Sequence, residues 1–124
     1  MSQESNKYEQ TCLSPGTVKL DLKLTIGASG AVSTVNGYGQ DGAAKNTTGI
    51  YDVTLDRGYN ALRCLTGSVQ TANVAATALF VRPVAYTAGS TTLEIATIVN
   101  AGTATEPASG DVIFLTAVFD ELGI

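Results

Sequence analysis

The strongest structural signal in this chain is a ten-residue segment in which apolar and polar residues alternate without exception. In TVKLDLKLTI, residues 17–26, every even position holds valine, leucine or isoleucine, and every odd position holds threonine, lysine or aspartate. Because successive side chains of a strand point to opposite faces, this pattern predicts a β-strand with one buried face and one solvent face. On the solvent face Asp21 lies between Lys19 and Lys23, which indicates a solvated charge stripe rather than a site.

Weaker strand and turn signals follow. Residues 27–30, GASG, are typical of a turn, and a strand is expected from Ala31, in which Asn36-Gly37 could close a tight turn or mark a bulge. The Gly-rich stretch 39–49 lacks the order of a phosphate-binding loop, G-x-x-x-x-G-K-[ST], so it is predicted to be a plain surface loop.

The second half of the chain contains further strand candidates at residues 68–73, 79–87, 91–99 and 111–119. Pro83 lies inside the second of these. Because proline cannot donate a hydrogen bond to a neighbouring strand, we expect that strand to be bulged or to lie at an edge of the sheet. The last candidate, DVIFLTAVF, is apolar on both faces, which predicts a central strand.

These segments predict one all-β domain. A chain of 124 residues with 44% hydrophobic content suits a single core that needs neither disulfides nor a metal to fold. Turn signals about every 10 to 15 residues predict a small β-sandwich or β-barrel of about six to seven antiparallel strands with one short helix. Residues 1–16 are polar and end in SPG, so we expect an extended N-terminal arm on the domain or on a neighbour, before a β domain over residues 17–124.

The most distinctive run, GIYDVTLDRGYNALRCL at residues 49–65, carries two aspartates on one face of an expected strand. Carboxylates at positions i and i+4 of a strand lie about 13 Å apart, too far for a glycosidase pair or for ligands of one metal ion. Tyr59, Leu62 and Leu65 are three apart, as one helical turn would place them, and Asp56 is suited to cap a helix. The run therefore predicts a strand leading into a short helix or turn at one end of the core. The residues expected to build this structural corner are Tyr51, Val53, Leu55, Asp56, Tyr59 and Leu62.

The composition lacks the chemistry that most enzymes need. The chain has no histidine, which is the usual general base at neutral pH and the commonest metal ligand, and two cysteines alone do not make a zinc site. We therefore expect no catalytic activity, no cofactor and no metal. There is also no tryptophan to stack on sugars. A sugar site would need tyrosines aligned on one face, and the candidates are Tyr38, Tyr51, Tyr59 and Tyr86.

Charge is scarce and unevenly distributed. The net charge of −4 argues against a nucleic-acid partner, which rewards clustered lysine and arginine. All seven basic residues precede Pro83, and the segment after Arg82 holds five acidic residues and no basic one. A weakly charged C-terminal third, with turns of small residues, indicates a surface that a partner covers.

No apolar run approaches the roughly 20 residues that span a bilayer, and the N-terminus has no signal-peptide core. We therefore expect a protein made in the cytoplasm, with no membrane partner. Cys12 and Cys64 are expected to stay reduced in that compartment. Cys64 is further expected to be a small buried hydrophobic residue.

Two motifs resemble those of a known family. Residues 49–62 match G-[IY]-Y-x-V-T-L-D-x-x-Y-N-x-L, and residues 106–111 match a [DE]-P-x-S-G-D turn. Over residues 25–120 the chain resembles small structural proteins that are encoded among the head genes of tailed bacteriophages and act as capsid decoration or cement proteins. Neither motif carries chemistry.

This resemblance implies a virion protein on the outer surface of an icosahedral head, where it binds the major capsid protein and braces adjacent capsomers. It also implies a homotrimer at the threefold positions of the shell, assembled in the host cytoplasm. The weakly charged C-terminal third and the polar arm agree with this expectation. A receptor- or carbohydrate-binding β-module of a phage tail or fibre is the alternative that the residues leave open.

Overall fold

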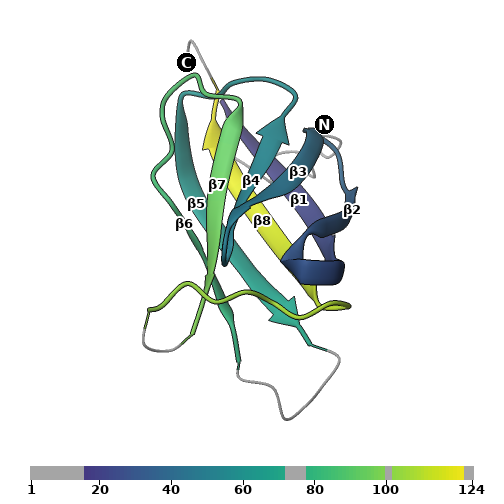
Figure 1. Ribbon diagram of the computed structural model, residues 1–124. Coiled ribbons are helices and arrows are strands. Elements are labelled where there is room, and N and C mark those ends of the chain that lie inside the picture. The colour runs from purple at the N-terminus through teal and green to yellow at the C-terminus, as the bar shows by residue number, and fades with distance from the viewer. Residues whose placement is uncertain (1–15, 72–77, 100–101, 122–124) are drawn as a thin grey trace, which may run out of the picture.

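The computed structural model describes residues 16–71, 78–99 and 102–121, which form a nearly closed barrel of eight antiparallel strands (Figure 1). The strands are β1 (Thr17–Ile26), β2 (Val32–Asn36), β3 (Gln40–Thr47), β4 (Ile50–Leu55), β5 (Ala61–Gln70), β6 (Phe80–Pro83), β7 (Thr92–Ile98) and β8 (Val112–Asp120), and a 3-10 turn, η1, spans Ala28–Gly30. Their order around the barrel is β2-β1-β8-β5-β6-β7-β4-β3. The predicted all-β fold is confirmed. The predicted arm, residues 1–16, lies outside the described residues except for Gly16.

The strictly alternating segment forms β1 and supplies one wall of the core, as its pattern predicted. Its even-numbered side chains from Leu20 to Ile26 are at most 6% exposed. They pack in one cluster with Val53 of β4, Ile95 of β7 and Phe119 of β8, each of which is 0% exposed. Burying a side chain of this size contributes roughly 1.5–3 kcal/mol relative to leaving it in water, so this cluster dominates the stability of the barrel.

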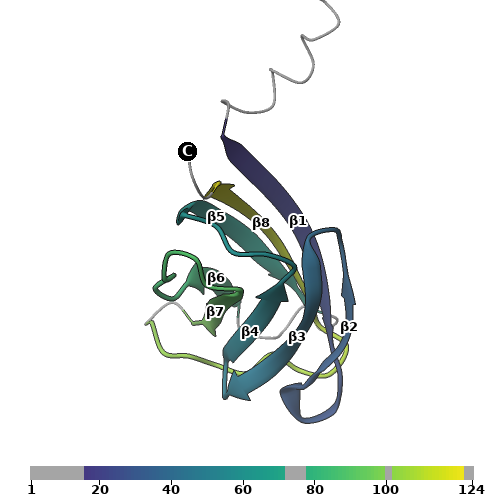
Figure 2. The same ribbon diagram turned by 90° about the horizontal axis from the view of Figure 1, so that it is seen from above.

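β8 is a central strand, which confirms the prediction from its apolar sequence. It pairs with β1 on one side and with β5 on the other along almost its whole length. In the view from above, β1, β8 and β5 curve along one side of the barrel, and β6, β7 and β4 lie along the other (Figure 2). The outer surface of the barrel beside β8 is therefore built from three long, firmly paired strands.

The Gly-rich stretch 39–49 is largely a strand, so the prediction of a plain loop is wrong. Residues Gln40–Thr47 form β3, which pairs with β4, but the register shifts between Gln40 and Gly42 and again between Lys45 and Thr47. Each bulge inserts a residue and breaks the two-residue period that reveals a strand in sequence. β3 raises the number of strands to eight, above the six to seven expected.

Residues 56–65 contain no helix, so the helical alternative for the structural corner is wrong. The chain bends after Leu55 and enters β5 at Ala61. Leu62 and Leu65 are three apart yet both pack against the core, because the register of β5 shifts between Leu62 and Cys64. The bulge also turns Cys64 outward, where it is an exposed free cysteine rather than the buried residue expected.

β6 is held almost entirely by β7. It pairs with β7 at every position from Phe80 to Pro83, whereas Ser68–Phe80 is the single pair that joins it to β5. Val84 donates its N–H to the Glu94 carbonyl of β7, so the N–H of the preceding residue would point toward β5. That residue is proline and has no N–H, which explains why the ladder to β5 stops. The prediction that this strand is bulged or lies at an edge of the sheet is wrong, because β6 lies between β5 and β7 in the strand order and pairs with β7 without a register shift.

The fold brings basic residues from the earlier part of the chain next to acidic residues from the later part. Bases that precede Pro83 pair with acids that follow it in three salt bridges: Lys45 with Glu106, Arg57 with Glu121, and Arg63 with Asp120. Three of the five acids after Pro83 are therefore paired with bases, and these pairs join the middle of the chain to its last described third.

Candidate functional site

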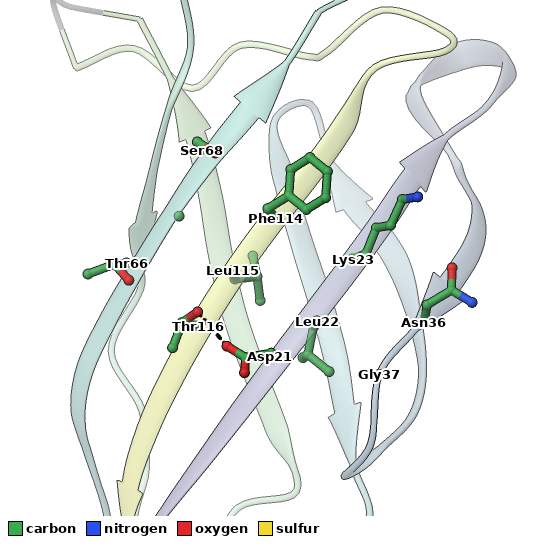
Figure 3. Close-up of a pocket in the computed structure, with 11 residues that line it drawn as sticks. Asp21, Leu22, Lys23, Asn36, Gly37, Thr66, Ser68, Phe114, Leu115 and Thr116 are labelled. Atoms are coloured by element: carbon green, nitrogen blue, oxygen red, sulfur yellow. Dashed lines mark hydrogen bonds between the residues drawn. The ribbon is translucent and has the colours of Figure 1, made fainter. Parts of the chain in front are cut away.

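An open groove of about 590 Å³ lies on the outer face of β1, β8 and β5 and reaches the end of β2 (Figure 3). Phe114 of β8 stands between Lys23 of β1 and Ser68 of β5, because these residues are cross-strand neighbours. Phe114 is 39% exposed, although it belongs to a central strand. We call this surface the Phe114 groove.

The alternation of β8 explains the position of Phe114. Ile113 and Leu115 on either side of it point inward and are at most 2% exposed, so Phe114 must point outward. The ammonium of Lys23 lies 6.0 Å from the centre of the Phe114 ring. This is the outer limit of a cation–π contact, and the ring keeps a solvent-facing surface on which a ligand could stack.

Polar side chains surround the aromatic ring. The Thr116 hydroxyl donates to the Asp21 carboxylate at 2.7 Å, shown as the dashed line in Figure 3, and Lys19 lies 3.9 Å from the same carboxylate. Thr66 and Asn36 add a hydroxyl and an amide along the rim. The groove thus offers one aromatic surface and several hydrogen-bonding groups, with few charges to desolvate.

Glycines allow the strands and loop around the groove to approach closely. A Cβ on Gly67 of β5 would lie 2.6 Å from the Phe114 carbonyl oxygen, and one on Gly37 would lie 2.4 Å from the Asp21 carbonyl oxygen. Gly37 also has a φ of +123°, which side chains disfavour. The turn that begins at Gly37 therefore packs closely against β1. The residue after Gly37, Tyr38, is 94% exposed.

The residues of the predicted structural corner lie in the barrel interior and not in the groove. Tyr51, Val53, Leu55 and Tyr59 are at most 2% exposed, Leu62 packs against the same core, and Asp56 is exposed. The ring of Tyr59 stacks on Phe119 with centroids 4.5 Å apart, and Tyr86 meets Phe119 edge-on at 5.3 Å. This aromatic cluster fills the end of the core beside the bend at residues 56–60.

A polar network fixes the other end of the core. The Tyr51 hydroxyl donates to the Gly30 carbonyl at 2.7 Å, and Lys45 pairs with Glu106 and donates to the Ser29 carbonyl at 3.0 Å. Burial, with the nearby Glu106 carboxylate, raises the pKa of Tyr51 to about 12 from its ordinary value of 10.0. The network holds the turn at residues 106–111 against η1.

Both motifs that suggested a family have structural roles in the fold. In the turn at residues 106–111, the Asp111 carboxylate accepts the Ala108 N–H at 2.9 Å, and Gly110 donates its N–H to the Ile26 carbonyl at 2.8 Å. In the run at residues 49–62, Asp52 accepts a hydrogen bond from the Asn46 amide at 3.0 Å. These carboxylates close turns and bridge strands.

The sequence did not reveal the Phe114 groove. Of the tyrosines considered for sugar stacking, Tyr51 and Tyr59 are buried, so the tyrosines do not align on one exposed face. The strand that carries Phe114 was interpreted only as a central strand. The alternation of this strand could have predicted the exposed ring. Ile113 and Leu115 are buried, so Phe114 between them lies on the opposite face.

The geometry suits binding by stacking and hydrogen bonding. Among the described residues, no three histidine, cysteine, aspartate or glutamate side chains are grouped so that they could hold a metal ion. Nor does any helix in the described ranges have the length and apolar character needed to cross a membrane.

No protein-family model, curated protein or solved structure matches this chain.

Proposed function

We propose that this protein is a decoration protein that binds the outer surface of a tailed-phage head and braces adjacent capsomers of the major capsid protein. The observation that carries the proposal is the Phe114 groove, in which an aromatic ring lies exposed on a firmly paired central strand. Tyr38, in the turn that borders the groove, is a second exposed aromatic side chain. Aromatic residues are enriched at the centres of protein interfaces, where a few buried side chains contribute most of the affinity.

The charge of the groove supports this mode of binding. Asp21 and Lys23 are the charged residues among those that line it, and both lie at the surface. A partner can therefore cover the groove without removing water from many charges, which is the most costly step in forming an interface. The sequence resemblance to decoration proteins points to the same class of partner.

We further propose that the working form is a homotrimer at the threefold positions of the shell. Copies around an axis multiply each weak contact, so avidity can retain a subunit that would dissociate as a single copy. Light scattering of the isolated protein measures the oligomer, and a stable monomer would contradict this part of the proposal.

Binding to purified phage shells tests the role of the groove. Phe114→Ser should weaken binding at least tenfold, whereas Phe80→Ser should bind normally, since Phe80 is 50% exposed on β6 outside the groove. Binding of the wild-type protein should persist over a salt series, because salt screens charge attraction and leaves apolar contact intact. Equal binding by both variants, or release of the protein at moderate salt, would count against the proposal.

The groove also supports a second candidate, a carbohydrate-binding module. A sugar could stack on Phe114 while Asp21, Asn36 and Thr66 meet its hydroxyls, since pocket sites combine an apolar surface with a few convergent polar groups. A glycan array separates the two candidates. Glycan binding that Phe114→Ser abolishes would favour the module, and an array without binding, together with retained binding to shells, would favour the decoration protein.

A further inference from the structure

An asparagine followed by a glycine lies at the rim of the Phe114 groove. Asn36 is the last residue of β2, Gly37 begins the turn to β3, and the two form the single Asn-Gly pair of the chain. Asn36 lines the groove together with Lys23, its cross-strand neighbour on β1, and Figure 3 shows both residues at the same side of the groove. A chemical change at Asn36 therefore alters the groove itself.

The fold leaves both residues of this pair open to solvent. Asn36 and Gly37 are exposed, and β2 stands at the end of the strand order, so it has a paired strand on one edge only. Within the described residues the Gly37 N–H donates no backbone hydrogen bond, and the Asn36 side chain has no hydrogen-bond partner. The amide nitrogen of Gly37 and the side-chain amide of Asn36 are thus free to react with each other.

We propose that Asn36 converts without an enzyme to aspartate and isoaspartate through a cyclic succinimide, and that this conversion weakens binding at the Phe114 groove. The Gly37 amide nitrogen gives up its proton to solvent base and attacks Cγ of Asn36. A bond forms between these two atoms, the bond from Cγ to Nδ2 breaks, and Nδ2 takes up a proton and leaves as ammonia. Because the ring closes between adjacent residues, the chain itself holds the reacting groups together.

Water then opens the five-membered ring at one of its two carbonyl carbons. Addition at Cγ breaks the bond from Cγ to the Gly37 nitrogen and leaves aspartate with the ordinary backbone. Addition at the Asn36 carbonyl carbon breaks the bond from that carbon to the same nitrogen, so the main chain runs through Cγ as isoaspartate. In both cases the nitrogen takes up a proton, and no atom is oxidised or reduced. Each product carries a carboxylate in place of the amide.

The other described asparagines lack this combination of features. Asn46 and Asn60 are each followed by a residue that carries a Cβ, which hinders the approach of that residue's nitrogen, whereas glycine has none. The Asn46 side-chain amide is also held by the Asp52 and Glu94 carboxylates, at 3.0 and 3.3 Å. Asn46 and Asn60 therefore serve as internal controls.

The new carboxylate changes the charge of the groove. The lining holds one acid, Asp21, and one base, Lys23, and a carboxylate at position 36 would lie directly across from Lys23, so that two acids face one base. Isoaspartate also lengthens the backbone where space is short, since a Cβ on Gly37 would lie 2.4 Å from the Asp21 carbonyl oxygen. A partner that covers the groove would then have to remove water from an additional charge. This effect on binding rests on the proposed function.

Peptide mapping of the aged protein tests the chemistry, because trypsin separates the three described asparagines. Cleavage after lysine and arginine gives peptides 24–45, 46–57 and 58–63, each of which contains one asparagine. During incubation at mildly alkaline pH, peptide 24–45 should gain about one dalton and separate into aspartate and isoaspartate forms, and fragmentation should assign the gain to Asn36. Its conversion should be at least about tenfold faster than that of the other two peptides. No gain in peptide 24–45, or equal rates in all three, would overturn the proposal.

Binding to purified phage shells tests the consequence for the groove. Asn36→Asp should bind at least about threefold more weakly than the wild-type protein at low salt. Asn36→Gln is the matched control, which should bind normally and keep its mass during ageing, because closure of the larger ring is slower.

The outcomes of the binding test separate this inference from the proposed function. Normal binding by Asn36→Asp, while Phe114→Ser binds weakly, would overturn the effect of the conversion on binding and leave the proposed function standing. Shells that bind no form of the protein would contradict the proposed function and the effect on binding together, and the peptide map would still decide whether Asn36 is modified.

Discussion

Strands with a paired neighbour on both edges, β4, β7 and β8 (the closed side of the barrel wall), and β5 (the open side) are built from similar residues but bury them to different extents. Leu93 of β7 and Ile113 of β8 are 0% exposed, whereas Leu62 and Leu65 of β5 pack against the same core and stay partly exposed. The difference lies in the neighbouring strands, since β7 and β8 have a paired strand on both edges and β5 has almost none on one. Burial of a leucine in this fold is therefore decided by strand pairing and not by the residue itself.

The largest expected effect comes from truncating a leucine on the closed side. Leu93→Ala should lower the free energy of unfolding by about 3–4 kcal/mol, because it leaves a cavity in a fully packed region. Leu65→Ala should cost about 1 kcal/mol, since solvent already reaches that side chain. Chemical denaturation of both variants measures the difference. Equal costs would mean that the β5 side is covered in solution.

A smaller effect is expected where the closed side buries a hydroxyl. Tyr51→Phe should cost about 1–2 kcal/mol, because the Gly30 carbonyl loses its buried donor. Tyr38→Phe is the control, since its hydroxyl is in solvent and its loss should change little. Thermal unfolding at neutral pH compares the two variants, and similar losses would contradict a role for the buried hydrogen bond.

The raised pKa of Tyr51 adds a pH dependence to this prediction. The unfolded chain ionises Tyr51 near pH 10, and the folded protein does so only near pH 12, because the folded state favours the neutral phenol. Its contribution to stability is full below pH 10 and is lost as the pH rises to 12. Denaturation between these pH values should show a shallower decline for Tyr51→Phe than for the wild-type protein, and parallel declines would contradict it.

The Lys45–Glu106 salt bridge beside the closed side should contribute more to the free energy of unfolding than a salt bridge on β5. Lys45→Met should cost about 1 kcal/mol, because it leaves the half-buried Glu106 carboxylate without its cation. Urea denaturation of the wild-type protein and of Lys45→Met, at low and at moderate salt, measures this loss. A loss that disappears with salt would show that the pair behaves as a surface pair.

The smallest effect is expected for the salt bridge on the open side. Arg63 lies 2.9 Å from Asp120, but its side chain is 54% exposed, and exposed pairs contribute little. Arg63→Met should change the free energy of unfolding by about 0.5 kcal/mol or less under the same conditions. A loss as large as that of Lys45→Met would remove the distinction between the two sides.

The strands with regular alternation could be predicted, and the irregular ones could not. β1 and β8 follow from their residue patterns, because each carries an uninterrupted apolar face. β3 was missed because two bulges and its small residues hide the two-residue period. The expected helix after Asp56 was wrong for a related reason, since a bulge in β5 reproduces the three-residue spacing of a helical turn.

The Phe114 groove depends on pairing that a sequence does not display. Its sides come from β1, β5 and β8, which are far apart in the chain, and the register between them brings Lys23, Ser68 and Phe114 side by side. The outward position of Phe114 could have been deduced from the alternation of β8. The close approach of β8 to Gly67 could not have been deduced, because the register decides which residue lies beside a glycine.

The central position of β8 has a consequence for synthesis on the ribosome. β8 is the last described strand to emerge, yet it separates β1 from β5, and its Thr116 bonds to Asp21, which lies 95 residues earlier. Before it emerges, β1 and β5 each lack the partner that covers one edge. Pairing of β1 and β5 with β8 therefore waits until residues 112–120 have emerged from the ribosome. A nascent chain stalled before Val112 would present two open edges and an uncovered leucine-rich face, the features that drive aggregation of incomplete β proteins.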